Sequence, residues 1–462
     1  MTLRSFLESS VGSVFDCAPA CRMESILIKN GTLITMNARR EVIQADLSIT
    51  ESRIQRIAPR IVTRASRVLD ASNKIVLPGF VQTHVHLCQT LMRGVGDDLP
   101  LLDWLRKRIW PLEAAHDPVS LRTSAQLGLA ELIQGGTTTI LTMETVHDTA
   151  VVFEEACRSG VRAIVGKCFM NAGDGVPRRL LQSAALAFKE SESLYRDWHG
   201  QSDGRIRLGL APRFILSCTE GLLRDADAMA RERGLLMHTH ASENRDEVAL
   251  VRNMTGRGNV EAFEHYGLLH EKLCLAHCVW VSGREQRLLR DRQARVLHCP
   301  SSNLKLGSGI APVWKMHQAG ISISFGADGA SCNNNLDMFQ EMRLAALLQK
   351  ALQGPKAMPA STVLWMATAG GARALSLEQE VGSLEVGKRA DLIIVDLQKV
   401  HSAPVLNPVA ALVYSGKSTD VETVIVNGQM LMRKRELLTL DRERILRASQ
   451  HEFQRLATRA GI

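Results

Sequence analysis

Several histidines and carboxylates of this chain have types and spacings that suit a metal ion. His84 and His86 stand one residue apart in "FVQTHVH" (80–86). Since alternate residues of a strand share a face, both imidazoles are expected to point the same way. His240, His277 and Asp328 follow much later in the chain. Three imidazoles and one carboxylate suit Zn²⁺ or Fe²⁺ and leave a position open for water.

Short β-rich runs alternate with longer amphipathic stretches through the middle of the chain, a pattern typical of parallel βα units. Eight such runs can be counted, at 74–86, 137–144, 161–169, 206–214, 235–243, 272–278, 294–300 and 321–329. They predict a (β/α)8 barrel of the TIM type, whose active site lies at the C-terminal ends of the strands. The histidines and the aspartate all stand at such ends, so we expect them to converge on one rim.

The two ends of the chain have a different character. Residues 23–76 and 381–440 contain short strands and turns, in stretches such as "SILIKNGTLITM" and "VETVIVNGQMLM". We expect them to form one small β-sandwich beside a barrel over 77–380. Residues 441–462 are amphipathic and predict a C-terminal helix. Residues 1–22 are expected to be a loose extension.

The composition limits the kind of protein this can be. Of the 462 residues, 45% are hydrophobic and 23% charged, which is ordinary for a globular protein. The net charge of +8 comes from scattered Lys and Arg, and aromatic residues make up only 4%, so we expect no nucleic-acid partner. We find no apolar run long enough to span a membrane and no convincing signal peptide. We therefore expect no membrane partner and a cytoplasmic location.

The order of these ligands, H-x-H, then His, then His, then Asp on strands 1, 5, 6 and 8, resembles the amidohydrolase superfamily. The segments "HTHASENRDEV", "LAHCVWV" and "GADGASCNNNLDMF" are similar to its ATZ/TRZ-like branch. That branch includes 5'-methylthioadenosine/S-adenosylhomocysteine deaminases, 5'-deoxyadenosine deaminases, guanine deaminases and triazine hydrolases. The resemblance covers nearly the whole chain and implies a metal-dependent hydrolase with a barrel fold.

The resemblance also assigns the metal ligands, which are His84, His86, His240 and Asp328. For His277 it implies either a ligand role or a contact with the bound water. Binuclear relatives use a carboxylated lysine at the end of the fourth strand. Here that strand ends in Arg213, and the only nearby lysine, Lys167, stands on the third. We therefore expect one divalent ion, with Zn²⁺ preferred and Fe²⁺ as the alternative.

Three residues are expected to carry the reaction. Asp328 can accept a proton from the attacking water, and Glu243 is placed to donate one to the ring nitrogen beside the carbon under attack. His277 would orient the water or the developing oxygen. Together they would replace an exocyclic ring amine by oxygen and release ammonia, which is the chemistry of an aminohydrolase acting on cyclic amidines.

Four further residues bear on the substrate. Glu113, in "WPLEAAHD", is expected to bind ribose hydroxyls, as a Glu in a similar segment does in adenosine-type relatives. Gln89 can offer a donor and an acceptor to a heterocycle edge. Arg213 and Phe214 stand in "APRFILSCTE", which resembles guanine deaminases, and could grip a purine carbonyl and stack on the ring.

The expected substrate is therefore a small purine-type molecule. A 5'-modified adenosine such as 5'-deoxyadenosine, 5'-methylthioadenosine or S-adenosylhomocysteine comes first, and guanine and a triazine are the alternatives. A catalytically dead scaffold is disfavoured because every ligand position is filled. The family also allows a homo-oligomer.

Overall fold

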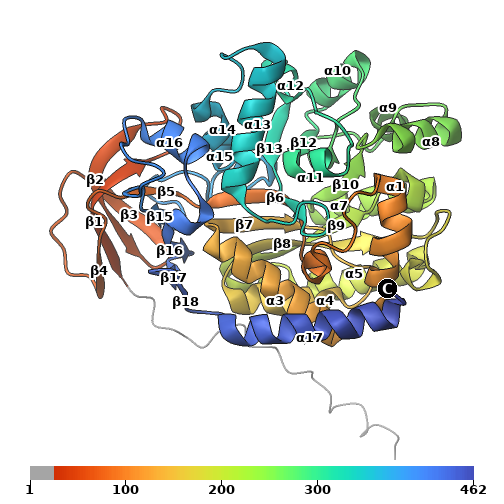
Figure 1. Cartoon of the computed structure of the whole chain (residues 1–462), viewed down its shortest axis with the longest axis horizontal. Coiled ribbons are helices and arrows are strands. Elements are labelled where there is room, and N and C mark those ends of the chain that lie inside the picture. The colour runs from red at the N-terminus through yellow and green to blue at the C-terminus, as the bar shows by residue number, and fades with distance from the viewer. Residues whose placement is uncertain (1–24) are drawn as a thin grey trace, which may run out of the picture.

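The computed structural model describes residues 25–462, so the extension expected at 1–22 lies outside the described residues. The central feature is a parallel sheet of strand order β13-β12-β11-β10-β9-β8-β7-β6-β14 (Figure 1). Its strands are β6 (Phe80–His86), β7 (Thr137–Thr142), β8 (Arg162–Phe169), β9 (Ile206–Pro212), β10 (Met237–Ala241), β11 (Leu273–His277), β12 (Arg295–His298), β13 (Ser322–Phe325) and β14 (Asp328–Gly329).

The sheet closes on itself through its last short strand. β14 follows shortly after β13 and pairs in parallel with β6, where Asp328 lies opposite Val85. The link between β13 and β14 passes so near to β6 that a Cβ on Gly326 would stand 2.5 Å from the carbonyl oxygen of His84. Glycine is required there because any side chain would collide with the backbone. The predicted barrel is confirmed.

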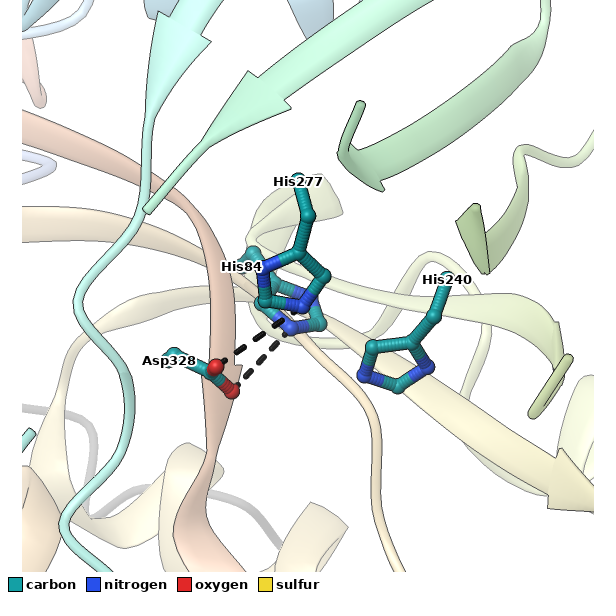
Figure 2. Close-up of side chains that lie close together, drawn as sticks. All are labelled: His84, His240, His277 and Asp328. Carbon is teal, nitrogen blue, oxygen red and sulfur yellow. Dashed lines mark ion pairs between the residues drawn. The ribbon is translucent and has the colours of Figure 1, made fainter. Parts of the chain in front are cut away.

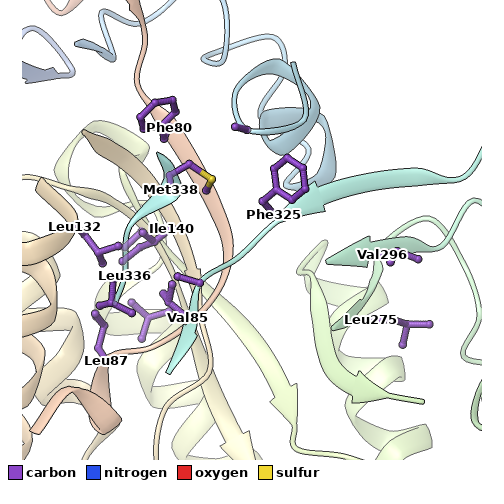
Figure 3. Packing of buried hydrophobic residues seen from close by; sticks show 14 of the residues in the cluster. Phe80, Val85, Leu87, Leu132, Ile140, Leu275, Val296, Phe325, Leu336 and Met338 are labelled. Carbon is purple, nitrogen blue, oxygen red and sulfur yellow. The ribbon is translucent and has the colours of Figure 1, made fainter. Parts of the chain in front are cut away.

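Helices cover the outside of the barrel. They are α3 (Pro118–Gln134), α4 (Thr149–Ser159), α5 (Ala184–Trp198), α6 (Gln201–Gly204), α7 (Glu220–Arg233), α8 (Arg245–Thr255), α9 (Asn259–His265), α10 (Gly283–Asp291), α11 (Pro300–Lys305), α12 (Val313–Gln318), α13 (Met338–Gln353), α14 (Ala360–Met366) and α15 (Ala369–Ala374). Short 3-10 turns are η3 (Arg178–Leu180) and η4 (Ile215–Ser217). Phe80, Ile140 and Phe325 of the strands share one core with Leu132 of α3 and Met338 of α13 (Figure 3).

The connection from β6 to β7 carries extra elements at the C-terminal ends of the strands. They are η1 (Leu87–Met92), α1 (Leu101–Trp104), the π-helical η2 (Leu105–Ile109) and α2 (Trp110–Ala115). Trp104 and Trp110 of this segment share a core cluster with Met143 and Phe214. A π-helical turn is uncommon and is frequently found at functional sites. This segment forms one wall of the rim.

Both chain ends contribute to a second, smaller domain, as predicted. Its sheet has the order β18-β17-β16-β15-β5-β1-β2-β3, with β4 paired to β1. The strands are β1 (Ile26–Ile34), β2 (Val42–Thr50), β3 (Arg53–Ala58), β4 (Arg67–Asp70), β5 (Ile75–Pro78), β15 (Leu392–Val395), β16 (Val421–Val426), β17 (Gln429–Arg433) and β18 (Glu436–Leu437). The antiparallel pair of β5 and β15 joins the two parts, which lie side by side in Figure 1. This domain also carries α16 (Pro408–Tyr414) and η5 (Ser418–Asp420).

A buried ion pair connects the small domain to the barrel. Arg162, at the start of β8, donates two hydrogen bonds to the carboxylate of Asp391, at nitrogen–oxygen distances of 2.8 and 3.0 Å. Asp391 also accepts a hydrogen bond of 2.8 Å from the backbone of Asn427. Both charged side chains are only 1% exposed, so this charged contact between the two domains is buried.

The amphipathic C-terminal stretch forms the helix α17 (Arg442–Ala460). It lies along α3 (Figure 1) and also contacts α2. Leu456 of α17 is buried in the same cluster as Trp104 and Trp110, and Arg459 donates a hydrogen bond of 2.9 Å to the carbonyl of Ala115. The last helix therefore supports the rim wall. None of the helices within residues 25–462 has the length and hydropathy of a membrane span.

Candidate metal centre and active site

Four side chains of ligand type meet at the C-terminal rim of the barrel. His84 of β6, His240 of β10, His277 of β11 and Asp328 of β14 each offer one ligand atom, and these atoms lie within 4.8 Å of one another. In Figure 2 the imidazoles gather beside the Asp328 carboxylate. Strands far apart in the chain thus bring one set of donors together, as the barrel topology predicts.

His86 borders the same group. Its Nε2 atom lies 3.2 Å from Oδ1 of Asp328, the same distance as Nε2 of His84. Its ring stacks on that of His240 with centroids 5.4 Å apart. The structure therefore brings together all the residues of the expected metal centre. His277 belongs to the four residues whose ligand atoms lie within 4.8 Å of one another, although the resemblance had left its role open.

Each of these imidazoles has its Nδ1 atom bonded away from the shared centre. The partners are Nε2 of His238 for His84 at 2.6 Å, the Met143 carbonyl for His86 at 2.8 Å, the Arg213 carbonyl for His240 at 2.7 Å and Oδ1 of Asn303 for His277 at 2.8 Å. A carbonyl oxygen only accepts, so a ring nitrogen bonded to one carries the proton. The Nε2 atoms of His86, His240 and His277 are then free to present lone pairs to the centre, as metal ligands do.

Two of the histidine nitrogen atoms at the centre have no hydrogen-bond partner among the described residues. Nε2 of His84 and Nε2 of His277 are buried and make no hydrogen bond in the part of the chain that is described. Burial lowers the pKa of His84 to about 4, so this imidazole is neutral near pH 7 and keeps its lone pair. Three imidazoles and one carboxylate fit a divalent metal ion.

Asp328 is held in place by its neighbours. The Ser302 hydroxyl donates to Oδ2 at 2.6 Å, and the backbone N–H of Gly329 donates to Oδ1 at 2.8 Å. Both Asp328 and His277 have a left-handed backbone, with φ of 63° and 72°. This conformation is uncommon for residues with a Cβ and is often found where a functional site constrains the chain.

Glu243 lies beside the cluster. Its Oε2 atom is 3.5 Å from Nε2 of His277. Burial raises the pKa of the Glu243 carboxyl to about 7. Its backbone N–H donates to Oε2 of Glu247 at 3.2 Å, and Asn259 donates to the other oxygen of Glu247. A carboxyl group with a pKa near 7 can both donate and accept a proton at neutral pH.

A pocket lies over the cluster. Its polar lining is His86, Gln89, Arg213, His240, Glu243, His277 and Asp328, and its apolar lining is Leu101, Trp104, Leu105, Phe214 and Leu306. Three of the four expected substrate residues therefore face the same space as the candidate metal ligands. The apolar side comes mainly from the α1–η2 wall, which could pack against a heterocycle.

Glu113, the fourth expected substrate residue, lies on α2 and does not line the pocket. Arg213 donates to both of its carboxylate oxygens, at 2.5 and 3.1 Å. Gln89 donates to Oε1 at 2.8 Å and accepts from Ser331 at 2.6 Å. Glu113 is only 3% exposed. Its carboxylate is thus already bonded to Gln89 and Arg213, two of the polar residues that line the pocket.

Lys167 is bonded to groups outside the cluster. Its ammonium donates to Oε1 of Gln182 at 3.0 Å, pairs with Glu190 at 3.1 Å and also donates to the carbonyl of Val146. Within residues 25–462, no other group of three or more His, Cys, Asp or Glu side chains is placed to hold a metal ion.

The structure adds three orienting residues that the sequence had not singled out, namely His238, Ser302 and Asn303. His238 had a signal, because it alternates with His240 in "HTH" and therefore shares its face of the strand. Ser302 and Asn303 stand in "HCPSSN" on α11, but their partners, Asp328 and His277, lie on β14 and β11. Local spacing does not reveal such contacts.

The barrel and this donor set define a class of metal-dependent hydrolases. Residues 75–431 match the amidohydrolase family. The chain belongs to the amidohydrolase family, and it is a metal-dependent hydrolase.

Named relatives narrow the comparison. The chain is 38% identical over 444 residues to a 5-methylthioadenosine/S-adenosylhomocysteine deaminase of Pelotomaculum thermopropionicum, covering 95% of this chain and 100% of the relative. It is 38% identical over 422 residues to a 5'-deoxyadenosine deaminase of Methanosphaera stadtmanae, covering 91% and 96%. A solved adenosine deaminase from Xanthomonas campestris with bound zinc has a TM-score of 0.88 at 30% identity, covering 94% of this chain and 98% of that one.

Proposed function

We propose that this chain is an aminohydrolase that replaces the exocyclic ring amine of a 5'-modified adenosine by oxygen and releases ammonia. The observation that carries the proposal is the position of Glu243, whose pKa is raised to about 7, beside a donor set of three histidines and Asp328. The names of the two curated relatives support the substrate class.

One zinc ion is the proposed cofactor. Its proposed ligands are His84, His86, His240 and Asp328, with His277 bonded either to the ion or to the water. When bound, such an ion lowers the pKa of water and stabilises negative charge on the attacking oxygen. The zinc in the Xanthomonas campestris structure supports zinc over iron.

The protein groups would manage the protons of the attack. As the water oxygen adds to the ring carbon that bears the amine, Asp328 takes one proton from that water. Glu243, protonated beforehand, gives its proton to the adjacent ring nitrogen, so that negative charge does not build up on the ring. His277, with Nδ1 held by Asn303, directs Nε2 toward the water.

The same two carboxyl groups would complete the reaction. Asp328 returns its proton to the amine as the carbon–nitrogen bond breaks, and ammonia leaves. Glu243 takes the hydroxyl proton as the carbonyl of the product forms. Asp328 is then ionised and Glu243 protonated, as at the start, so the cycle consumes only water and the amino-bearing substrate.

Recognition of the purine is proposed for Gln89, Arg213 and Phe214, which line the pocket. Glu113 would act on the substrate through Gln89 and Arg213, because both of its oxygens are hydrogen-bonded to them. A bidentate pair of this kind fixes the orientation of the guanidinium. Guanine is the second candidate substrate, since an oriented Arg213 beside Phe214 would suit a ring carbonyl.

The test is ammonia release from zinc-loaded protein. The panel contains 5'-deoxyadenosine, 5'-methylthioadenosine, S-adenosylhomocysteine, adenosine, guanine and an aminotriazine. We expect turnover of the 5'-modified adenosines and a fall of about 10²–10⁴-fold in kcat for Glu243→Gln, because the proton donor is lost.

Each other result would contradict a stated part of the proposal. Turnover of guanine alone would replace the adenosine assignment and make Arg213 and Phe214 the determinants of the substrate. Glu243→Gln at full activity would remove Glu243 as the proton donor. A cytoplasmic location and self-association stay predictions.

A further inference from the structure

A second hollow lies outside the active-site pocket. This outer groove has a volume of about 650 Å³. It is lined by Asp98, Leu99, Pro100, Asn244, Arg245, Asp246, Trp280, Lys305, Leu306, Gly307 and Ser308. The lining combines charged, polar and apolar side chains, so the groove is suited to a ligand that has more than one kind of group.

The outer groove borders the active-site pocket. Leu306 lines both spaces. Leu101 of the pocket follows Pro100 of the groove, and Glu243 of the pocket precedes Asn244 of the groove. The side of the pocket at Leu306 therefore faces the groove, in the direction in which a substituent on a ring held beside Glu243 would extend.

An uncompensated cation stands in this groove. The guanidinium of Arg245 lies 4.0 Å from the ring centroid of Trp280. The indole is fixed, because its N–H donates to the carbonyl of Ser308 at 2.6 Å. Among the described residues Arg245 makes no ion pair, and its side chain is exposed. A guanidinium stacked in this way keeps its N–H edge free for a carboxylate.

Two carboxylates in the same groove are also without a cationic partner. Asp98 and Asp246 are exposed and form no ion pair within residues 25–462. Lys305, by contrast, is already bonded to Asp97 at 2.5 Å and to Asn334 at 2.8 Å. The groove therefore offers one free cation and two free anions.

We propose that the outer groove is a subsite for an α-amino acid group on the 5' substituent of the substrate. Arg245 would bind the carboxylate of that group, and Asp98 or Asp246 its ammonium. The apolar Leu99 and Leu306 would contact the linking carbons. The inference rests on the proposed function and narrows it, because it makes S-adenosylhomocysteine the preferred substrate over 5'-methylthioadenosine.

The test compares three thioadenosines in the zinc-loaded enzyme and in variants of exposed residues. The substrates are S-adenosylhomocysteine, 5'-methylthioadenosine and 5'-S-(3-carboxypropyl)-5'-thioadenosine, which has the carboxylate but no amine. The variants are Arg245→Gln, Asp98→Asn and Asp246→Asn. Arg252→Gln is the matched control, since Arg252 is exposed on the same helix α8 but does not line the groove.

The expected pattern follows the charges. Arg245→Gln should raise KM about tenfold for both substrates that carry the carboxylate, and change it by less than about twofold for 5'-methylthioadenosine. Asp98→Asn or Asp246→Asn should raise KM for S-adenosylhomocysteine alone. Arg252→Gln should resemble the wild type.

The failures are distinguishable. If Arg245→Gln changes KM equally for all three substrates or for none, while 5'-methylthioadenosine is deaminated, the subsite is overturned and the proposed function stands. If the wild type deaminates none of the adenosines, the proposed function falls and the subsite with it.

Discussion

The role of a single histidine in this site depends on the group bonded to its second ring nitrogen. Three of the imidazoles have a carbonyl oxygen as partner, but His84 is bonded to another histidine, His238. For Nε2 of His84 to present a lone pair, its Nδ1 must donate the proton to Nε2 of His238. His238 is buried and lies in a position to set the tautomer of the proposed metal ligand His84.

Replacing His238 should therefore weaken metal binding. We expect His238→Phe to raise the Kd for zinc about 10–100-fold, since this is the usual effect of losing such a partner. Chelator competition measures the Kd directly, without reference to activity. His265→Phe is the control, because His265 is exposed on α9. An unchanged zinc affinity for His238→Phe would show that His84 is oriented by other contacts.

At the scale of elements, α13 supports the segment that carries Asp328. Glu341 on α13 accepts hydrogen bonds from the backbone of Ser301 at 3.1 Å and from Asn333 at 2.9 Å. Asn333 in turn donates to the carbonyl of Ala327 at 2.7 Å. Burial raises the pKa of the Glu341 carboxyl to about 7. Glu341 therefore links α13 to the loop beside the proposed metal centre.

The raised pKa of Glu341 predicts a pH dependence of stability. The pKa of a Glu side chain in an unfolded chain is about 4.3. Between that pH and about 7 the folded state binds more protons, so the contribution of Glu341 to the free energy of unfolding falls as pH rises. Glu341→Gln removes this titration. In urea unfolding, the free energy of unfolding of Glu341→Gln minus that of the wild type should increase as the pH is raised from 5 to 8.

The absolute stability of Glu341→Gln is not the readout, because an amide loses one of the two accepted hydrogen bonds. The informative quantity is the change with pH of the difference between wild type and variant. Parallel pH profiles for the two proteins would contradict the assignment of a raised pKa to this carboxyl.

At the scale of the whole molecule, Arg162 and Asp391 couple the small domain to the barrel. The pair is buried and doubly hydrogen-bonded. Arg162 is one strand length away from the rim, because it begins β8 while the site lies at the strand ends. The Arg162–Asp391 pair therefore contributes to the stability of the protein and to the arrangement of its two domains, and it lies far from the candidate active site.

Removing one partner of this pair should destabilise the whole protein. We expect Asp391→Ala to lower the free energy of unfolding by about 3–5 kcal/mol, because the Arg162 charge is left buried and uncompensated. Urea unfolding of the zinc-loaded protein measures this. Glu264→Gln, which breaks the partly exposed pair with Arg292, should have a much smaller effect. Equal effects of both variants would mean that the buried pair carries no special weight.

The sequence by itself determined the barrel, the two-ended small domain and the class of chemistry. Each of the eight β-rich runs can be recognised from the alternation of its own neighbouring residues. The candidate metal ligands can be recognised from their residue type and their place at the end of a run. His84, His86, His240 and Asp328 could therefore be expected together before any contact was known, with the role of His277 left open. The structure places all five side chains at one rim.

Only the tertiary structure decided which groups these residues contact. Glu113 was expected to face a ribose, but its carboxylate is bonded to Arg213 and Gln89. That contact depends on how the segment after β6 packs against the end of β9. The His84–His238 bond and the outer groove have the same origin. Such contacts join segments distant in the chain, and the spacing of residues along a sequence carries no information about the angle at which two elements pack.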